Sequence, residues 1–490
     1  MDSEQKKFAN ACKDGHVDVV RHLLADDRVN PADNSNAAIR CACYFGHVDI
    51  VLLLMGDSRV DPADLSNEAI RWACENGQTD VVCLLLDDDR VNPTDNDNEA
   101  IRWACRYGYT DVVRVLLADS RVNPVDKNNE AIQQACRKGH VDVVRLLLDD
   151  DRVNPGSENN YAMRWACIKG HVDVVRLLLA DSRVNPADKN NEAIQLACEN
   201  GHVDVVHLLL TDSRVNPADK NNEAIQSACA HNHVDVVRLL LVDSRVNPAD
   251  DHNHAIQTSC LHGDIDVVRV LLADARVNPA DNHNEAIRWA CQNGHLDIVR
   301  LLLADARVNP ADYNNEAIEL ACRYGHNDVV RLLLADHRVN PANMSKNTIQ
   351  EACRNNYFEV ICLLLMDPRI DIHHVVSTCL EVMRKCGKRE SICALLTLVG
   401  IEPFYNKWGR FCIKQGPLDP KVFNLDMLRH WQSTLYINLY KQDEEFRNGP
   451  YGVLLKRRLE VAGLYGSVVL TSKLPVEMIE LVLEYMFFLS

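Results

Sequence analysis

The feature that most constrains this chain is a strict internal period of 31 residues. A cysteine recurs at this spacing twelve times, from Cys12 to Cys353, without an insertion or a deletion. A proline keeps the same step from Pro31 to Pro341. A fixed period of this size is typical of arrays in which each repeat contacts only its neighbours. For these 490 residues we therefore expect an elongated solenoid rather than several globular domains.

One repeat, residues 190–220, reads NNEAIQLACENGHVDVVHLLLTDSRVNPADK and predicts two helices followed by a turn. Asn191 is a candidate N-cap of the first helix, and Gly201 ends that helix where a left-handed conformation costs little. Asp204 opens the second helix. Asn216 precedes a proline and is therefore biased to extended geometry, which predicts a turn. Two helices of about ten residues each cannot bury their apolar faces alone, so stacked neighbours must supply the core.

The period continues for one unit beyond the last regular cysteine. In residues 371–401, Arg384 stands in place of the cysteine and Met383 in place of the preceding alanine. A more polar last unit is expected of a repeat that caps an array. We predict twelve or thirteen repeats over residues 1–401, with 371–401 as a degenerate capping unit.

The repeat resembles the ankyrin repeat. The family motif T-P-L-H-x-A-A-x-x-G-H-x-x-V-V-x-L-L-L corresponds here to E-A-I-R/Q-x-A-C-x-x-G-H-V-D-V-V-R-L-L-L, over roughly residues 4–401. The Thr-Pro helix start is replaced by Asn-Glu-Ala, and the usual period is longer, at about 33 residues. Because the missing residues fall in the connecting finger, we expect a tight turn instead of a β-hairpin. The resemblance implies an all-α solenoid that binds other proteins in a concave groove.

Histidines such as His171 and His202 recur after the glycine that ends each first helix. Equivalent positions in stacked repeats lie ~8–10 Å apart, too far for two histidines to share a zinc ion. The resemblance implies that these histidines fix the turn between the two helices. The same spacing exceeds the reach of a disulfide. Each cysteine replaces a small core alanine of the family motif, so we expect reduced, buried and unreactive thiols, and neither a metal ion nor a cofactor.

Four tryptophans share one position, two residues before the repeated cysteine. This position lies about 130° from the centre of the buried helix face, on its flank. One interpretation is an anchor for a partner in the groove, because Trp, Tyr and Arg tend to carry binding energy. The alternative is packing against the first helix of the neighbouring repeat. The candidate groove residues are Trp72, Trp103, Arg106, Tyr107, Trp165, Trp289 and Tyr324, with Tyr44 and Phe45 in the same set.

The net charge of −17 is unevenly distributed. Residues 402–490 contain 11 Lys and Arg against 10 Asp and Glu, which leaves −18 for the rest of the chain. An acidic array repels phosphate backbones, so we do not expect nucleic acid as a partner. The first residues show no apolar signal-peptide core, and no run of 18 apolar residues occurs. We therefore expect no membrane partner and a cytoplasmic location, with the nucleus as an alternative.

Residues 402–490 abandon the period and are predicted to form a small helical domain. Leu474–Met486 resembles the opening helix of an F-box, with the pattern L-P-x-E-x-x-x-x-I/V-L-x-Y, and is similar to the truncated F-box that ends poxvirus-type ankyrin proteins. That resemblance implies docking to the small Skp-type adaptor of a cullin ubiquitin ligase. The alternative is an amphipathic helix that closes the C-terminal domain. The candidate docking residues are Leu474, Pro475, Met478, Leu481, Val482 and Tyr485.

Three hypotheses about function follow. The first is an adaptor that recruits a protein substrate to a cullin-type ubiquitin ligase, and the second is an ankyrin scaffold with no link to a ligase. The third is an enzyme whose chemistry lies in residues 402–490. No G-x-G-x-x-G, P-loop or H-E-x-x-H motif occurs, and a catalytic set drawn from the repeats would be duplicated many times. We therefore predict that the protein is not an enzyme.

Overall fold

The computed structural model describes residues 3–371, isolated positions from 374 to 382, and residues 403–405, 411–413 and 416–417. Two units, Met1–Asp250 and Asp251–Ser490, make up the chain. Residues 3–371 form 24 α-helices in twelve consecutive pairs, with one short 3₁₀ helix before the last pair. The predicted solenoid of helix pairs is confirmed for these residues, and the predicted tight turns are confirmed too, because no β-strand occurs between 3 and 371.

The helices of the first unit are α1 (Ser3–Asp14), α2 (Val17–Leu24), α3 (Asp33–Phe45), α4 (Val48–Met55), α5 (Asp64–Glu75), α6 (Thr79–Leu86), α7 (Asp95–Tyr107), α8 (Thr110–Ala118), α9 (Asp126–Lys138), α10 (Val141–Leu148), α11 (Ser157–Lys169), α12 (Val172–Ala180), α13 (Asp188–Glu199), α14 (Val203–Thr211), α15 (Asp219–Ala230) and α16 (Val234–Val242). Those of the second unit are α17 (Asp250–His262), α18 (Ile265–Leu272), α19 (Asp281–Asn293), α20 (Leu296–Ala304), α21 (Asp312–Tyr324), α22 (Asn327–Ala335), the 3₁₀ helix η1 (Pro341–Asn343), α23 (Lys346–Arg354) and α24 (Phe358–Met366). The first residue of α17 is the last residue of the first unit.

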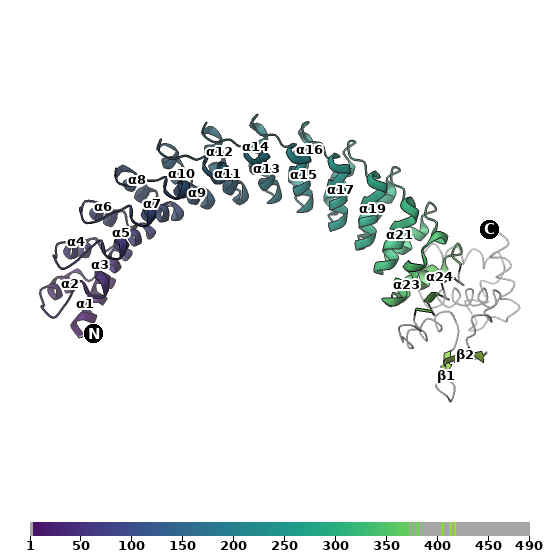
Figure 1. The fold of residues 1–490 in the computed structure, drawn as a ribbon, viewed down its shortest axis with the longest axis horizontal. Coiled ribbons are helices and arrows are strands. Elements are labelled where there is room, and N and C mark those ends of the chain that lie inside the picture. Colours follow the sequence, from purple (N-terminus) through teal and green to yellow (C-terminus); the bar gives the residue numbers. More distant parts are fainter. Residues whose placement is uncertain are drawn as a thin grey trace, which may run out of the picture. The chain divides into compact units, whose positions relative to one another are not determined.

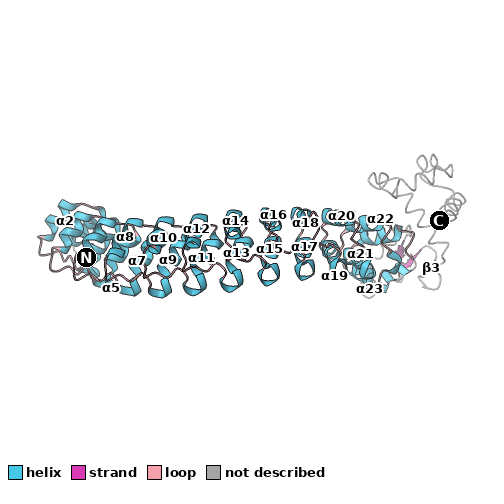
Figure 2. Ribbon diagram, turned by 90° about the horizontal axis from the view of Figure 1, so that it is seen from above, coloured by secondary structure: helices cyan, strands magenta, loops and turns pink. Residues whose placement is uncertain are grey.

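Each repeat contributes one odd-numbered and one even-numbered helix. Within each unit, odd-numbered helices pack on odd-numbered ones, and even-numbered helices pack on even-numbered ones. Figure 1 shows that in each unit the odd-numbered helices lie on the inner side of the curve, and Figure 2 shows the loops that connect the two rows of helices. We call the odd-numbered helices the inner helices and the even-numbered ones the outer helices.

The core of each repeat comes from one face of each helix, as the spacing of apolar residues predicts. In the repeat of α13 and α14 the buried side chains are Ala193, Ile194, Ala197 and Cys198 from the inner helix and Val205, Val206 and Leu209 from the outer helix. None of these is more than 3% exposed. Burial raises the pKa of the Cys198 thiol well above its usual value, so the thiol stays protonated. The prediction of buried thiols is confirmed for the cysteine ladder from Cys12 to Cys353.

In most inner helices the second, third and fourth residues are in the left-handed conformation. In α13 the φ angles of Lys189, Asn190 and Asn191 are 51°, 58° and 61°. The prediction that Asn191 is an N-cap is therefore wrong, because an N-cap residue has an extended backbone and no side-chain cap is formed at this helix start. For residues with a side chain this conformation costs roughly 1–2 kcal/mol each, and least for Asn and Asp. The same left-handed turn occurs at 34–36, 65–67, 96–98, 127–129, 158–160, 189–191, 220–222, 251–253, 282–284 and 313–315.

The last residue of each left-handed turn is an asparagine whose buried side chain links one repeat to the next. Asn191 is 3% exposed. Its Oδ1 accepts a hydrogen bond from the backbone N–H of Asn216 at 2.7 Å, and its Nδ2 donates to the carboxylate of Asp219. Asp219 also accepts from the Asn216 side chain at 2.8 Å. The left-handed turn is thus held in place by a partner in the next repeat, 25 to 28 residues further on.

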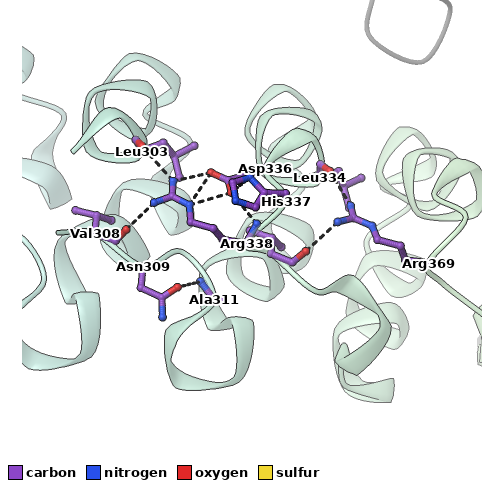
Figure 3. Close-up of polar contacts among 10 residues, drawn as sticks. Leu303, Val308, Asn309, Ala311, Leu334, Asp336, His337, Arg338 and Arg369 are labelled. Carbon is purple, nitrogen blue, oxygen red and sulfur yellow. Dashed lines mark hydrogen bonds and ion pairs between the residues drawn. The ribbon is translucent and has the colours of Figure 1, made fainter. Parts of the chain in front are cut away.

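A row of arginines makes a second set of bonds between repeats. Figure 3 shows Arg338, whose Nη1 donates to the carbonyl of Val308 at 2.9 Å and whose Nη2 donates to the carbonyl of Leu303 at 3.1 Å. Asp336 holds the guanidinium from the other side, with Nη2–Oδ2 at 2.6 Å. Leu303 lies in the last turn of α20, where carbonyls lack a partner within the helix, so the arginine of one repeat caps the outer helix before it. Arg369 repeats the arrangement one repeat later.

The described residues of 402–490 form three short strands, and the prediction of a small helical domain for the segment as a whole stays a prediction. β1 (Pro403–Tyr405), β2 (Phe411–Ile413) and β3 (Gly416–Pro417) form an antiparallel sheet in the order β1-β2-β3, with Phe404 opposite Cys412. Aromatic and β-branched residues such as those of β2 favour strands. Leu474–Met486 lies outside the described residues. The capping unit 371–401 is described only at 371 and at six positions from 374 to 382, all six of them helical.

We call the row of buried asparagines that end the left-handed turns the asparagine ladder. Its contribution to stability can be separated from the strain of the left-handed turn by comparing two neighbouring substitutions. Asn190→Ala and Asn191→Ala both place alanine at a positive φ, but only the second removes the two hydrogen bonds to the next repeat. We expect Asn191→Ala to cost about 1–3 kcal/mol more than Asn190→Ala, because a buried donor and acceptor lose their partner. Urea unfolding followed by circular dichroism measures the difference. Equal losses for the two variants would show that the ladder contributes nothing.

The Asp–Arg pairs predict how stability depends on pH. Hydrogen bonds from the Arg214 guanidinium hold the pKa of Asp212 below its usual value. A depressed folded-state pKa contributes stability that is complete above the unfolded-state pKa, about 3.9, and is lost as pH falls through the folded value. We expect a constant urea midpoint from neutral pH down to about pH 5 and a fall below about pH 4. The same depression recurs at Asp57, Asp88, Asp119, Asp150, Asp181, Asp243, Asp274, Asp305 and Asp336.

Asp212→Asn is the matched variant for this pH dependence. It should lower the midpoint at neutral pH and change it much less in acid, where the wild-type carboxyl is already protonated. An equal loss at both pH values would mean that the charge of Asp212 is not what stabilises the interface.

Candidate functional site

The candidate groove residues lie at the C-terminal ends of the inner helices. Trp72, Trp103 and Trp165 are half-buried on α5, α7 and α11. Arg106 and Tyr107 are exposed at the end of α7. In the second unit, Trp289 is half-buried on α19 and Tyr324 is exposed at the end of α21. These positions agree with the predicted flank of the helix, and we call this row the inner edge.

Within the first unit the structure brings the candidate residues together in small groups. The ring of Trp103 stacks on Tyr107 at 5.6 Å between centroids, and the Arg106 guanidinium lies 5.0 Å from the centre of the Trp103 ring. Trp72 contacts Tyr44 of the preceding repeat edge-on at 5.9 Å, and Tyr44 in turn contacts its neighbour Phe45 at 4.8 Å. Tyr44 and Phe45 are both exposed. The inner edge of α3, α5 and α7 therefore presents aromatic rings to solvent.

Trp165 is surrounded by residues that the sequence analysis missed. The Arg137 guanidinium of the preceding repeat lies 4.2 Å from the centre of its ring, and the Lys169 ammonium lies 5.8 Å from it. Tyr161 meets the ring edge-on at 5.9 Å. The signal was present in the sequence, because Arg137 lies one period after Arg106 and therefore occupies the same position of the repeat.

An open hollow of about 460 Å³ adjoins this group between α9 and α11. Its carboxylates come from Glu130 and Glu158. Glu130 pairs with Arg102 of the preceding repeat, and Glu158 accepts a hydrogen bond from Asn128 at 2.8 Å. The hollow is lined by Lys127, Asn128, Glu130, Gln133, Gln134, Arg137, Glu158 and Tyr161.

The repeated histidines bind backbone, in keeping with the structural role that the resemblance implied. The Nε2 of His171 lies 3.2 Å from the carbonyl oxygen of Arg137 in the preceding repeat, and His202 contacts Ile168 at 2.8 Å in the same way. His47, His140, His233, His295 and His326 repeat this contact. Among the residues that the structure describes, no group of three or more His, Cys, Asp or Glu side chains is placed to hold a metal ion.

A glycine precedes all of these repeated histidines except His233, which follows Asn232, and this glycine is needed by the repeat that follows. Gly139 has a φ of 80°, which disfavours any residue with a side chain, and a Cβ there would lie 2.7 Å from Nδ1 of His171. The glycine therefore ends its own helix and leaves room for the imidazole of the next repeat. This row of close contacts fixes the C-terminal ends of the inner helices, which carry the inner edge.

The comparisons with known proteins agree with this architecture. The family model described as Ankyrin repeats (3 copies) matches residues 60–128, 101–190, 180–250, 241–314 and 308–375. The chain belongs to the ankyrin repeat family. A comparison with curated proteins finds no match.

Ankyrin repeats are protein–protein interaction modules, typically without catalytic activity. The matched residues include all four tryptophans of the inner edge and end before residues 402–490. None of the helices in the described ranges is both long and apolar enough to cross a membrane.

Proposed function

We propose that the inner edge of the first unit is the surface on which this ankyrin protein binds its protein target. The observation that supports this most is the contact of half-buried Trp103 with the exposed Arg106 and Tyr107 at the end of α7. Aromatic residues and arginine dominate the binding energy of protein interfaces. Rings already stacked on one another lose little freedom when a partner covers them, which lowers the entropic cost of binding.

The alternative role for the tryptophans, packing against a neighbouring repeat, fits some of them better than others. The ring contacts of Trp103 are with Arg106 and Tyr107, which are on its own helix and exposed. Trp165, in contrast, lies under Arg137 of the preceding repeat. Trp103 is therefore better suited to a binding role than to filling space between repeats.

We also propose that the chain recruits its target to a cullin-type ubiquitin ligase in the cytoplasm or nucleus. The support is the sequence of Leu474–Met486, which resembles the opening helix of an F-box. A helix that docks in a groove presents anchors at i, i+3, i+4 and i+7, and this segment has Met478, Leu481, Val482 and Tyr485 at those positions. Without such docking, the protein is a scaffold whose function lies in the array alone.

Replacing Trp72 and Trp103 together by glutamine tests the inner edge. Gln134 occupies the equivalent position in α9, so glutamine is a residue that this fold accepts there. We expect binding of captured target proteins to weaken by about 30-fold or more, which corresponds to the roughly 2 kcal/mol of a hot spot. The full chain and the variant are compared by pull-down and quantitative mass spectrometry, with urea midpoints as the control. A large loss of stability with unchanged binding would show that the tryptophans only pack.

Deleting residues 472–490 tests the link to a ligase. The truncated chain should lose association with the Skp-type adaptor and cullin and should still capture the target that the full chain captures. Met478→Asp combined with Leu481→Asp is the milder variant, because it removes two apolar anchors and keeps the chain length. Capture of cullin that persists in both variants, or that is absent from the full chain, contradicts the ligase proposal and favours the scaffold.

A further inference from the structure

We propose that the inner edge of α7, α9 and α11 binds an extended, acidic segment of the partner protein. This inference rests on the proposed protein-binding function and specifies the chemistry of the partner. The surface consists of Arg106, Arg137, Lys138 and Lys169, together with the rings of Trp103 and Trp165. We call it the basic strip.

The basic strip spans three consecutive repeats of an acidic array. The position of Arg106 also carries a cation in other repeats, but Arg323 and Arg354 pair with Glu319 and Glu351 of their own helices. Four cations and no carboxylate occur at the C-terminal ends of α7, α9 and α11, in residues 103–108, 134–139 and 165–170. The inner helices on either side, α5 and α13, carry Glu75 and Glu199 at the position of Arg106. Because α7 packs on α9 and α9 on α11, the four cations lie at the same end of three neighbouring helices.

The cations of the basic strip are available to a ligand. In the part of the chain that the structure describes, none of the four forms an ion pair, and all four are exposed. Different arginines of the same row of helices are paired across repeats, for example Arg71 with Glu99 at 2.5 Å and Arg102 with Glu130 at 2.5 Å. Those pairs also occupy carboxylates of the inner helices that would otherwise repel an acidic partner.

The rings orient the cations for carboxylates. Arg137 lies over Trp165 at 4.2 Å from its centre, and Arg106 lies over Trp103 at 5.0 Å. A guanidinium held against an aromatic face keeps its N–H edge free for a bidentate bond to a carboxylate. The half-buried rings also reduce the exposure of that bond to water, which strengthens it.

The spacing of the repeats predicts the spacing of acidic residues in the partner. Equivalent positions of stacked helices lie ~8–10 Å apart, and an extended chain rises about 3.3 Å per residue. Arg106 and Arg137 occupy equivalent positions one period apart. A partner segment that crosses the repeats in extended form would therefore meet them with acidic residues about three positions apart.

Neither helix stabilisation nor nucleic-acid binding accounts for the basic strip as well as an acidic peptide does. Cations also stabilise the C-terminal ends of helices, but α5 and α13 have a glutamate at the same position, so the fold does not require a cation there. Nucleic acid is a polyanion as well, but a long phosphate backbone would approach an array that carries −18 outside residues 402–490. A short acidic peptide avoids most of that repulsion.

The test uses the full chain and a library of random twelve-residue peptides displayed on phage. The most enriched peptide is then synthesised, and its affinity is measured by fluorescence anisotropy for the wild type, for Arg137→Glu and for Arg145→Glu. Both variants make the same change of charge, and both residues belong to the repeat of α9 and α10, but Arg145 lies on the outer helix α10. Glutamate occurs naturally at the position of Arg137 in α5 and α13, so Arg137→Glu is compatible with folding. A thermal unfolding curve of each variant confirms this.

We expect enriched peptides to be acidic, with carboxylates about three residues apart, and to bind more weakly at high salt. Arg137→Glu should weaken binding by about tenfold or more, and Arg145→Glu by less than about twofold. Enriched peptides without net negative charge, or equal affinities for the two variants, overturn this inference and leave the proposed function intact. Failure to enrich any peptide counts against both. Tight binding of a single-stranded oligonucleotide that Arg137→Glu abolishes overturns the assignment to a protein partner.

Discussion

Hydrogen bonds from side chains of one repeat to the backbone of its neighbour are the interaction on which this structure depends. Apolar burial drives stacking but is not directional, and near-identical repeats could slide against one another. The asparagine of the left-handed turn, the arginine of the Asp–Arg pair and the repeated histidine each bond to defined partners in the adjacent repeat. A buried polar group left without that partner is costly, so these three rows fix the register of the stack.

Sequence reasoning reached the helix pairs because their signals are local. The apolar spacing of α13, the glycine at Gly201 and the turn before Pro217 can all be read within one repeat. It failed at Asn191 because capping rules consider only neighbours in the chain, whereas the partners of this side chain lie in the next repeat. The strands β1 and β2 were missed because the segment that contains them has no period to guide the prediction.

For the candidate site, the sequence predicted where the tryptophans lie but not what surrounds them. The helical wheel placed Trp103 on the flank of its helix, where the structure has it half-buried beside Arg106 and Tyr107. The contact of Arg137 with Trp165 crosses from one repeat to the next, so it depends on the stacking geometry and not on the wheel of a single helix. Aligning the repeats of the chain with one another would have marked Arg137 as the equivalent of Arg106.

The repeats keep the positions that hold them together and vary positions along the exposed inner edge. The asparagine that ends the left-handed turn occurs in ten repeats, whereas the inner edge carries Arg106, Ile168 or Glu199 at a single position. Because the three rows of hydrogen bonds between repeats do not use the side chain at this position, a substitution there disturbs none of them. Each repeat can therefore present a different side chain at the same spacing, and under the proposed function the order of these side chains along the inner edge determines which partner the array can bind.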